Sequence, residues 1–156
     1  MHYGRLTRSE SLAWAYTRKR ADPMNFKTPA SNTTATDHAA KILDHEAALG
    51  RVGGDADILV SLIDIFFAEI GAMMEALKTA IRNADHVQLE RSAHRIKGSV
   101  SIFGAAAATE TSLKLETAGR SGDIENASAI FCVLEQQIKL MCPALEKFWQ
   151  ELQAKR

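Results

Sequence analysis

The stretch that decides the fold runs from Asp55 to Ala84 and reads DADILVSLIDIFFAEIGAMMEALKTAIRNA. Asp55 is a favourable residue for capping the start of a helix, and Asn83-Ala84 is a favourable end. Between them bulky apolar residues recur at helical spacing: Ile58, Leu62, Ile65, Phe66, Ile70, Met73, Leu77 and Ile81. The spacing predicts one long helix that turns these side chains toward a core.

Similar helical patterns lie on both sides of this stretch. Before it, residues of about 38–50 predict a short helix that stops at Gly50. After it, Asp85 is expected to cap a helix, with Gln88 three residues later in a capping-box-like arrangement. The apolar stripe of that helix consists of Leu89, Ala93, Ile96, Val100 and Phe103.

Two further helices follow along the chain. An alanine-rich helix is predicted to begin at Ala105 and to end at Gly119 and Gly122. Asp123 is expected to cap a last helix, which Pro143 should kink or restart. No segment shows the alternating pattern of a strand.

The composition agrees with a helical globular domain. Apolar residues make up 46% of the chain and charged residues 24%, with nine glycines and three prolines among 156 residues. Because the joints between the predicted helices are short, sequential helices should be antiparallel neighbours. We expect residues 38–156 to form an all-α domain, an up-and-down antiparallel four-helix bundle with a short additional N-terminal helix.

Charge and hydropathy argue against several classes of function. The net charge is zero, which gives no support for binding nucleic acid or an acidic membrane surface. No apolar run approaches the ~20 residues of a membrane span, and the N-terminus lacks the apolar region of a secretory signal. Cys132 and Cys142 form no CxxC pair and are expected to be buried thiols in a reducing compartment. We therefore expect a cytoplasmic protein.

Residues 1–37 differ in composition from the rest of the chain. Residues 1–36 carry six basic and two acidic side chains, a net charge of +4. Their segment 9–21 is a candidate short helix with Leu12, Trp14 and Tyr16 as its only bulky apolar groups, and prolines and a polar run come next. We predict a leader or linker without defined structure, or a remnant of a preceding domain or of the expression sequence.

One face of the helix after Asp85 carries residues suited to chemistry. If its apolar stripe faces the core, His94 emerges at the edge of the bundle, and Lys97, Gly98 and Ser101 follow on the same side. A glycine inside a helix costs about 1 kcal/mol relative to alanine, and its asset is the room it leaves for another molecule beside His94. Lys97 is placed to stabilise a phosphoryl group on that histidine. The pKa of an unperturbed histidine is about 6.5, so a neutral and nucleophilic fraction exists at neutral pH.

These residues carry a resemblance to a known family. The segment AHRIKGS at 93–99, followed by FGA at 103–105, closely resembles the signature of histidine phosphotransfer (HPt) domains. LGRVGGD at 49–55 is similar to that family's approach to its long helix, and LE at 115–116, GR at 119–120 and GD at 122–123 are similar to its second half. The resemblance covers about residues 42–150. Ile96 stands where the family more often has leucine, and residues 1–37 have no counterpart.

The resemblance implies a phosphoryl carrier in a two-component phosphorelay. His94 would be phosphorylated at Nε2, Lys97 and Ser101 would support the phosphate, and Gly98 would admit the partner. That partner would be a receiver domain of a response regulator or hybrid histidine kinase, which docks over the histidine helix and the helix before it. Arg91 and Arg95 are expected to meet acidic groups of the receiver. The chain would not be an independent enzyme and would have no cofactor of its own, while the receiver would hold Mg²⁺.

Three alternatives stand beside this hypothesis. His86, Glu90 and His94 recur at four-residue steps, but eight residues of helix separate the two histidines by about 12 Å, too far for one metal ion. A histidine-kinase dimerisation hairpin would also display a histidine, but Arg95 follows it here rather than an acidic residue, and no glycine-rich nucleotide site follows. The third alternative is a helical interaction module in which His94 is not phosphorylated.

Overall fold

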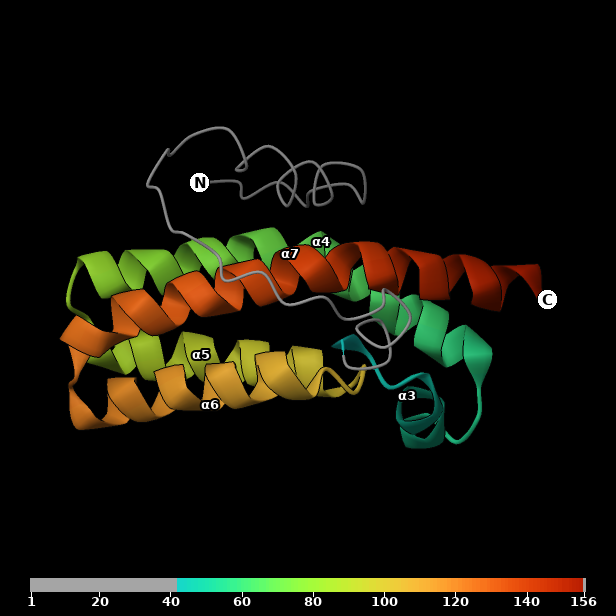
Figure 1. Cartoon of the computed structure of the whole chain (residues 1–156), viewed down its shortest axis with the longest axis horizontal. Helices are drawn as coiled ribbons and strands as arrows, with labels where there is room; N and C mark the ends of the chain where they lie inside the picture. The colour runs from blue at the N-terminus through green and yellow to red at the C-terminus, as the bar shows by residue number, and fades with distance from the viewer. Residues whose placement is uncertain (1–41, 156) are drawn as a thin grey trace, which may run out of the picture.

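The computed structural model describes residues 42–155, so the expectations for residues 1–37 lie outside the described part. Its helices are α3 (His45–Arg51), α4 (Ala56–Arg82), α5 (His86–Ser101), α6 (Ala106–Ser121) and α7 (Ile124–Ala154). The long helices pack as a ring, α4 on α5, α5 on α6, α6 on α7 and α7 on α4. Figure 1 shows them alternating in direction, with α3 at the end where α4 and α7 extend beyond α5 and α6. The predicted antiparallel bundle with a short extra helix is confirmed.

The start of α3 differs from the prediction of a helix over about 38–50. Leu43 and Asp44 lie outside any helix, and the Asp44 carboxylate accepts a hydrogen bond from the Ala47 amide at 2.9 Å. The chain is fixed there by the α5–α6 turn, because the Asp44 amide donates to the Phe103 carbonyl at 3.2 Å. A Cβ on Gly104 would lie 2.5 Å from the Asp44 Cβ. Residues 38–41 lie outside the described part and Ile42 is helical, so the predicted helix is interrupted at Leu43 and Asp44, and α3 starts at His45 with Asp44 as its cap.

The core side of α4 is rotated from the predicted one at two positions. Phe66, Ile70, Met73 and Leu77 are buried as expected, and Leu62 and Ile81 are partly buried. Ile58 and Ile65 are instead 49% and 54% exposed. Four apolar residues that the prediction left out are buried in their place: Leu59, Val60, Ile63 and Phe67. The first half of this helix is apolar on most sides, so spacing alone did not fix its rotation.

The three predicted aspartate caps are confirmed, but two predicted glycine ends are not: α3 continues through Gly50 to Arg51, and α6 continues through Gly119. Asp55, Asp85 and Asp123 each accept hydrogen bonds from amides in the first turns of α4, α5 and α7. The Asp85 amide donates to the Ala80 carbonyl at 2.9 Å, so Gln88 does not complete a reciprocal capping box. Gly119 does not end α6, which runs to Ser121 and stops at Gly122 in the left-handed conformation with φ 74°.

The last helix, α7, is continuous through Pro143, so the predicted restart there is wrong. Proline removes one backbone donor, and buried side chains on both sides of it, Cys142 and Leu145, hold the helix against the core. Burial raises the pKa of the Cys142 thiol to about 12. Cys132 is exposed, which corrects the expectation that both thiols are buried. No helix of the described part is long and apolar enough to cross a membrane.

The contact between α3 and α7 predicts a pH dependence of stability. His45 stacks on Phe148 with ring centroids 3.7 Å apart, and burial holds the pKa of His45 below its ordinary value of 6.5. Below that pH the unfolded chain takes up the proton more readily than the folded one, so stability should fall as the solution is acidified. We expect the melting temperature to drop between about pH 7 and about pH 5, and His45→Phe to reduce that drop. An identical drop in the variant would contradict the assignment to His45.

Candidate functional site

The predicted orientation of α5 is confirmed. Its stripe of Leu89, Ala93, Ile96 and Val100 is fully buried, as is Phe103 just beyond its end. Consequently the opposite residues face outward, and the His94 side chain is 69% exposed. The imidazole is therefore held on a rigid helix while most of its surface remains open to a partner.

A buried carboxylate on the neighbouring helix is hydrogen-bonded to Nδ1 of this histidine. The Glu116 side chain on α6 is only 7% exposed, and its Oε1 lies 3.1 Å from His94 Nδ1. Lys97 Nζ donates to Glu116 Oε2 at 2.5 Å. Arg120 Nη2 also donates to Oε1, at 3.1 Å, and Arg120 Nε donates to Glu90 on α5 at 3.0 Å. One carboxylate thus organises a histidine and two cations.

The charges around Glu116 favour its ionised form. The hydrogen bond from Lys97 lowers the pKa of Glu116 below its ordinary value of 4.5, burial opposes this, and the hydrogen bond with His94 lowers it further. Glu116 is therefore a carboxylate at neutral pH and can only accept hydrogen bonds. In the neutral imidazole the proton must consequently lie on Nδ1, which leaves the Nε2 lone pair free.

The close approach of α5 and α6 depends on Gly119. A Cβ at this position would lie 2.5 Å from the Glu90 amide nitrogen and 2.9 Å from the His86 carbonyl oxygen. Only glycine allows the two backbones to meet here. The glycine lies one turn beyond Glu116 on the same helix, so it sets how near that carboxylate comes to α5.

Comparison with known proteins agrees with this geometry. The family model of the Hpt domain matches residues 61–154, more than half of the chain. The chain belongs to the Hpt domain family. Among solved structures, this Hpt domain is similar to histidine-containing phosphotransfer protein B (HptB) from Pseudomonas aeruginosa, with 26% sequence identity and a TM-score of 0.64. The match covers 75% of this chain and 99% of that one. No match was found among the curated proteins.

The other predicted site residues also lie on α5, but they differ in their exposure and in the groups they contact. Gly98 is exposed, and a Cβ added to it would meet nothing within 4 Å. Arg95 reaches α4, where its Nη2 donates to Glu69 at 3.0 Å, and Arg91 is exposed. Ser101 Oγ donates to the Gly98 carbonyl at 2.8 Å. Seven residues of helix correspond to about 10 Å, so this geometry gives no support for a contact between Ser101 and a phosphate on His94.

The three residues of the metal hypothesis do not converge. Glu90 is paired with Arg120, and His94 with Glu116. Across residues 42–155, no three His, Cys, Asp or Glu side chains gather closely enough to hold a metal ion.

Sequence reasoning named neither Glu116 nor Arg120 as site residues of this Hpt domain. Both stand more than twenty positions after His94, on a different helix, so their contact with it depends on tertiary packing. One signal was available: Glu116 falls among otherwise apolar or small positions of α6, and a charged residue on the buried side of a helix requires a partner.

The Glu116 contacts predict a graded loss of reactivity. Glu116→Gln keeps an oxygen acceptor for Nδ1 but removes the charge, and we expect phosphate acceptance to slow by about 10-fold. Glu116→Ala leaves Lys97 and Arg120 without their shared carboxylate and should slow it by about 100-fold. The measurement is the rate of phosphorylation of the parent and both variants by the same phosphodonor, which should decrease from the parent to Glu116→Gln to Glu116→Ala.

Acid unfolding provides an independent check of the same contacts. Because the folded pKa of Glu116 is lowered, its ion pairs add stability above pH 4.5 and lose it as the pH falls below that value. Glu116→Gln should therefore be less stable than the parent at neutral pH, and the difference should shrink in acid. A difference that stays constant across this range would contradict the assignment.

Proposed function

We propose that this Hpt domain relays a phosphoryl group between receiver-domain aspartates, with Nε2 of His94 as the carrier atom. One observation carries the proposal: the imidazole is fixed at Nδ1 by a buried carboxylate and is otherwise exposed. An inert surface histidine requires no such partner. Family membership supports the same interpretation, since Hpt domains are phosphocarrier modules rather than catalysts.

The proposed transfer is a direct exchange of one bond for another. His94 Nε2 attacks the phosphorus of a receiver's aspartyl phosphate in line, the N–P bond forms, and the bond to the aspartate oxygen breaks, so the carboxylate leaves. The phosphorylated ring gains positive charge while its Nδ1 proton stays hydrogen-bonded to Glu116. The fixed carboxylate offsets that charge without rearrangement. A Mg²⁺ ion bound by the receiver would neutralise charge at the phosphoryl oxygens.

Lys97 is the proposed phosphate-supporting residue of this chain. Its side chain is 26% exposed, and its ammonium already lies beside the His94 base through their shared contact with Glu116. A short movement would bring the ammonium from Glu116 toward a phosphate on Nε2, while Arg120 keeps the carboxylate paired. We therefore propose that Lys97 stabilises the phosphorylated state more than the free one.

The proposed docking surface combines α5 with the exposed side of α4. Ile65 is 54% exposed and precedes Glu69 by one turn, and Glu69 holds Arg95 beside His94. Gly98, one turn after His94, adds no side chain to this surface. A receiver that buries Ile65 and pairs with Arg91 or Arg95 would have its aspartate above His94.

Phosphate donors distinguish the proposal from its alternatives. The chain is incubated with a receiver domain carrying phosphoaspartate, and separately with ATP alone. We expect acid-labile, base-stable label to appear only with the receiver. Label from ATP alone would indicate a kinase-type hairpin. No label from any receiver of the source organism would indicate an interaction module without phosphotransfer.

Substitution of Gly98 tests whether the receiver needs open space beside His94, separately from the reactivity of His94 itself. Because a Cβ there meets no other atom, Gly98→Ala and Gly98→Leu should both fold. We expect transfer from a phosphorylated receiver to slow with side-chain size, by about 100-fold or more for leucine, since a docked partner would lose its close approach. Phosphorylation by a small-molecule donor is the matched control and should change little. Equal slowing with both donors would show that Gly98 acts on His94 rather than on the partner.

A further inference from the structure

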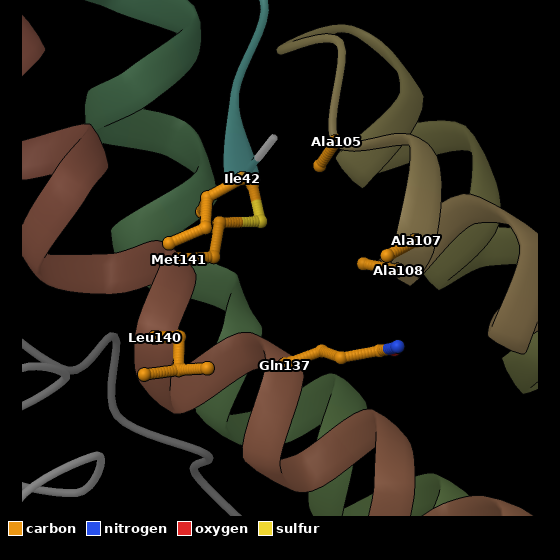
Figure 2. A pocket seen from close by; sticks show the side chains of 7 residues that line it. All are labelled: Ile42, Ala105, Ala107, Ala108, Gln137, Leu140 and Met141. Atoms are coloured by element: carbon orange, nitrogen blue, oxygen red, sulfur yellow. The ribbon is translucent and has the colours of Figure 1, made fainter. Parts of the chain in front are cut away.

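A groove between α6 and α7 has no role in the proposed phosphotransfer. It begins with a hollow of about 420 Å³ lined by Ala105 just before α6, by Ala108 of α6, and by Leu140 and Met141 of α7. A second hollow of about 450 Å³ lies further along the same two helices, at Leu113 and Ile130. Figure 2 shows the first hollow open between the two helices.

Two large, exposed apolar residues line this groove, Leu140 in the first hollow and Leu113 in the second. In the part of the chain that the structure describes, six large apolar residues are exposed, and three of them belong to α6 and α7: Leu113, Val133 and Leu140. Leu140 is the most exposed, at 62%. Several such residues beside two hollows mark a surface that another segment covers.

A polar atom inside the first hollow needs a donor. Figure 2 shows the Gln137 side chain extending from α7 toward α6. Its Oε1 is buried and accepts no hydrogen bond from the described residues. A buried acceptor without a donor is unfavourable, so a segment that brings an N–H or a basic side chain here is favoured.

The chain itself leads into this hollow. Ile42, the first described residue, is part of its lining, and 41 residues precede it. Residues 1–41 carry seven basic and three acidic side chains, whereas residues 42–155 carry eleven and sixteen, so the two parts have opposite net charge. The segment 9–21 supplies bulky apolar side chains at Leu12, Trp14 and Tyr16. About twenty residues join it to Ile42, enough to span roughly 65 Å when extended.

We propose that residues 9–21 dock in the groove between α6 and α7. Their bulky apolar groups cover Leu140 and Met141, and a leader donor satisfies Gln137 Oε1. This proposal differs from the sequence-based expectation of a leader without defined structure, and the experiments below distinguish the two. The groove lies away from the α4–α5 surface assigned to the receiver, so a docked leader leaves His94 accessible.

Fluorescence of the full chain tests the docking. Trp149→Phe leaves Trp14 as the only tryptophan and keeps an aromatic ring at a partly buried position. We expect acrylamide to quench Trp14 several-fold less in the native protein than in urea. Leu140→Lys should remove that protection, because the charge replaces an exposed apolar contact without disturbing the core. Ile58→Lys, a similarly exposed position on α4, is the matched control and should leave it intact.

Amide hydrogen exchange of the full chain with both natural tryptophans gives a second measurement. Residues 9–21 should exchange more slowly in the parent than in Leu140→Lys. The proposal is overturned if Trp14 is quenched equally in native buffer and in urea. It is equally overturned if Leu140→Lys and Ile58→Lys behave alike, which would place the leader elsewhere. Protection that appears only with a dimer in light scattering would assign the groove to a second copy of the chain and would also overturn it.

Discussion

Replacement of His94 by glutamine is expected to abolish phosphate acceptance. Glutamine lacks a ring nitrogen that can form the N–P bond, so no residual transfer through this site should remain. The side chain of residue 94 is largely exposed and the buried stripe of α5 is untouched, so folding should be nearly unchanged. The measurement is the yield of acid-labile label from a phosphorylated receiver, with circular dichroism and a thermal melt of the same sample.

His86 provides the matched control for this result. It is also an exposed histidine of α5, two turns earlier, but it has no assigned contact with Glu116. His86→Gln should accept phosphate as the parent does. If the His94 variant keeps its label while the His86 variant loses it, the carrier atom has been assigned to the wrong residue.

Alanine at the two glycines inside α5 and α6 should change stability in opposite directions. Gly119→Ala places a Cβ 2.5 Å from the Glu90 amide nitrogen, and neither backbone can yield unless the helices separate. We expect destabilisation of about 1–3 kcal/mol, together with slower transfer because Glu116 moves from His94. Gly98→Ala meets open space and should stabilise the helix by up to about 1 kcal/mol.

Urea titrations of the two variants and the parent decide between these outcomes. The comparison is well matched because both positions are helical and the substitution is identical. A Gly98→Ala variant that unfolds more easily than the parent would show that this glycine serves packing. A Gly119→Ala variant of parental stability would show that the two helices can separate without cost.

The sequence predicted α5 better than α4 for a physical reason. In α5 the apolar residues are separated by charged and polar ones, so only one rotation of the helix buries the stripe, and His94 was placed correctly. In the first half of α4, apolar residues occupy nearly every side. Several rotations then satisfy the same spacing, and Ile58 and Ile65 were assigned to the wrong side. Spacing fixes a rotation only where polar residues define the opposite face.

The parts of the site that escaped prediction depend on contacts between helices. The position of Glu116 among buried residues of α6 signals a partner, but which residue it contacts depends on how α6 is aligned along α5. Gly119 was expected to end a helix, which is one common use of glycine. Glycine also allows two backbones to approach closely, and here the second backbone belongs to α5, which the local sequence around Gly119 does not indicate.

All the groups that hold the imidazole belong to one helical hairpin, α5 and α6, which together with their short turn occupy residues 86–121. Glu69 and Ile65, which flank the proposed docking surface, belong to α4 instead. The proposal therefore predicts that substitutions at exposed positions of α4 change receiver recognition, while the contacts of His94 within α5 and α6 are unaffected. For the proposed docking surface, exchange of the exposed α4 residues Ile65 and Glu69 between two relatives is expected to change the preferred receiver. The buried residues of α4 and the contacts of His94 would stay the same.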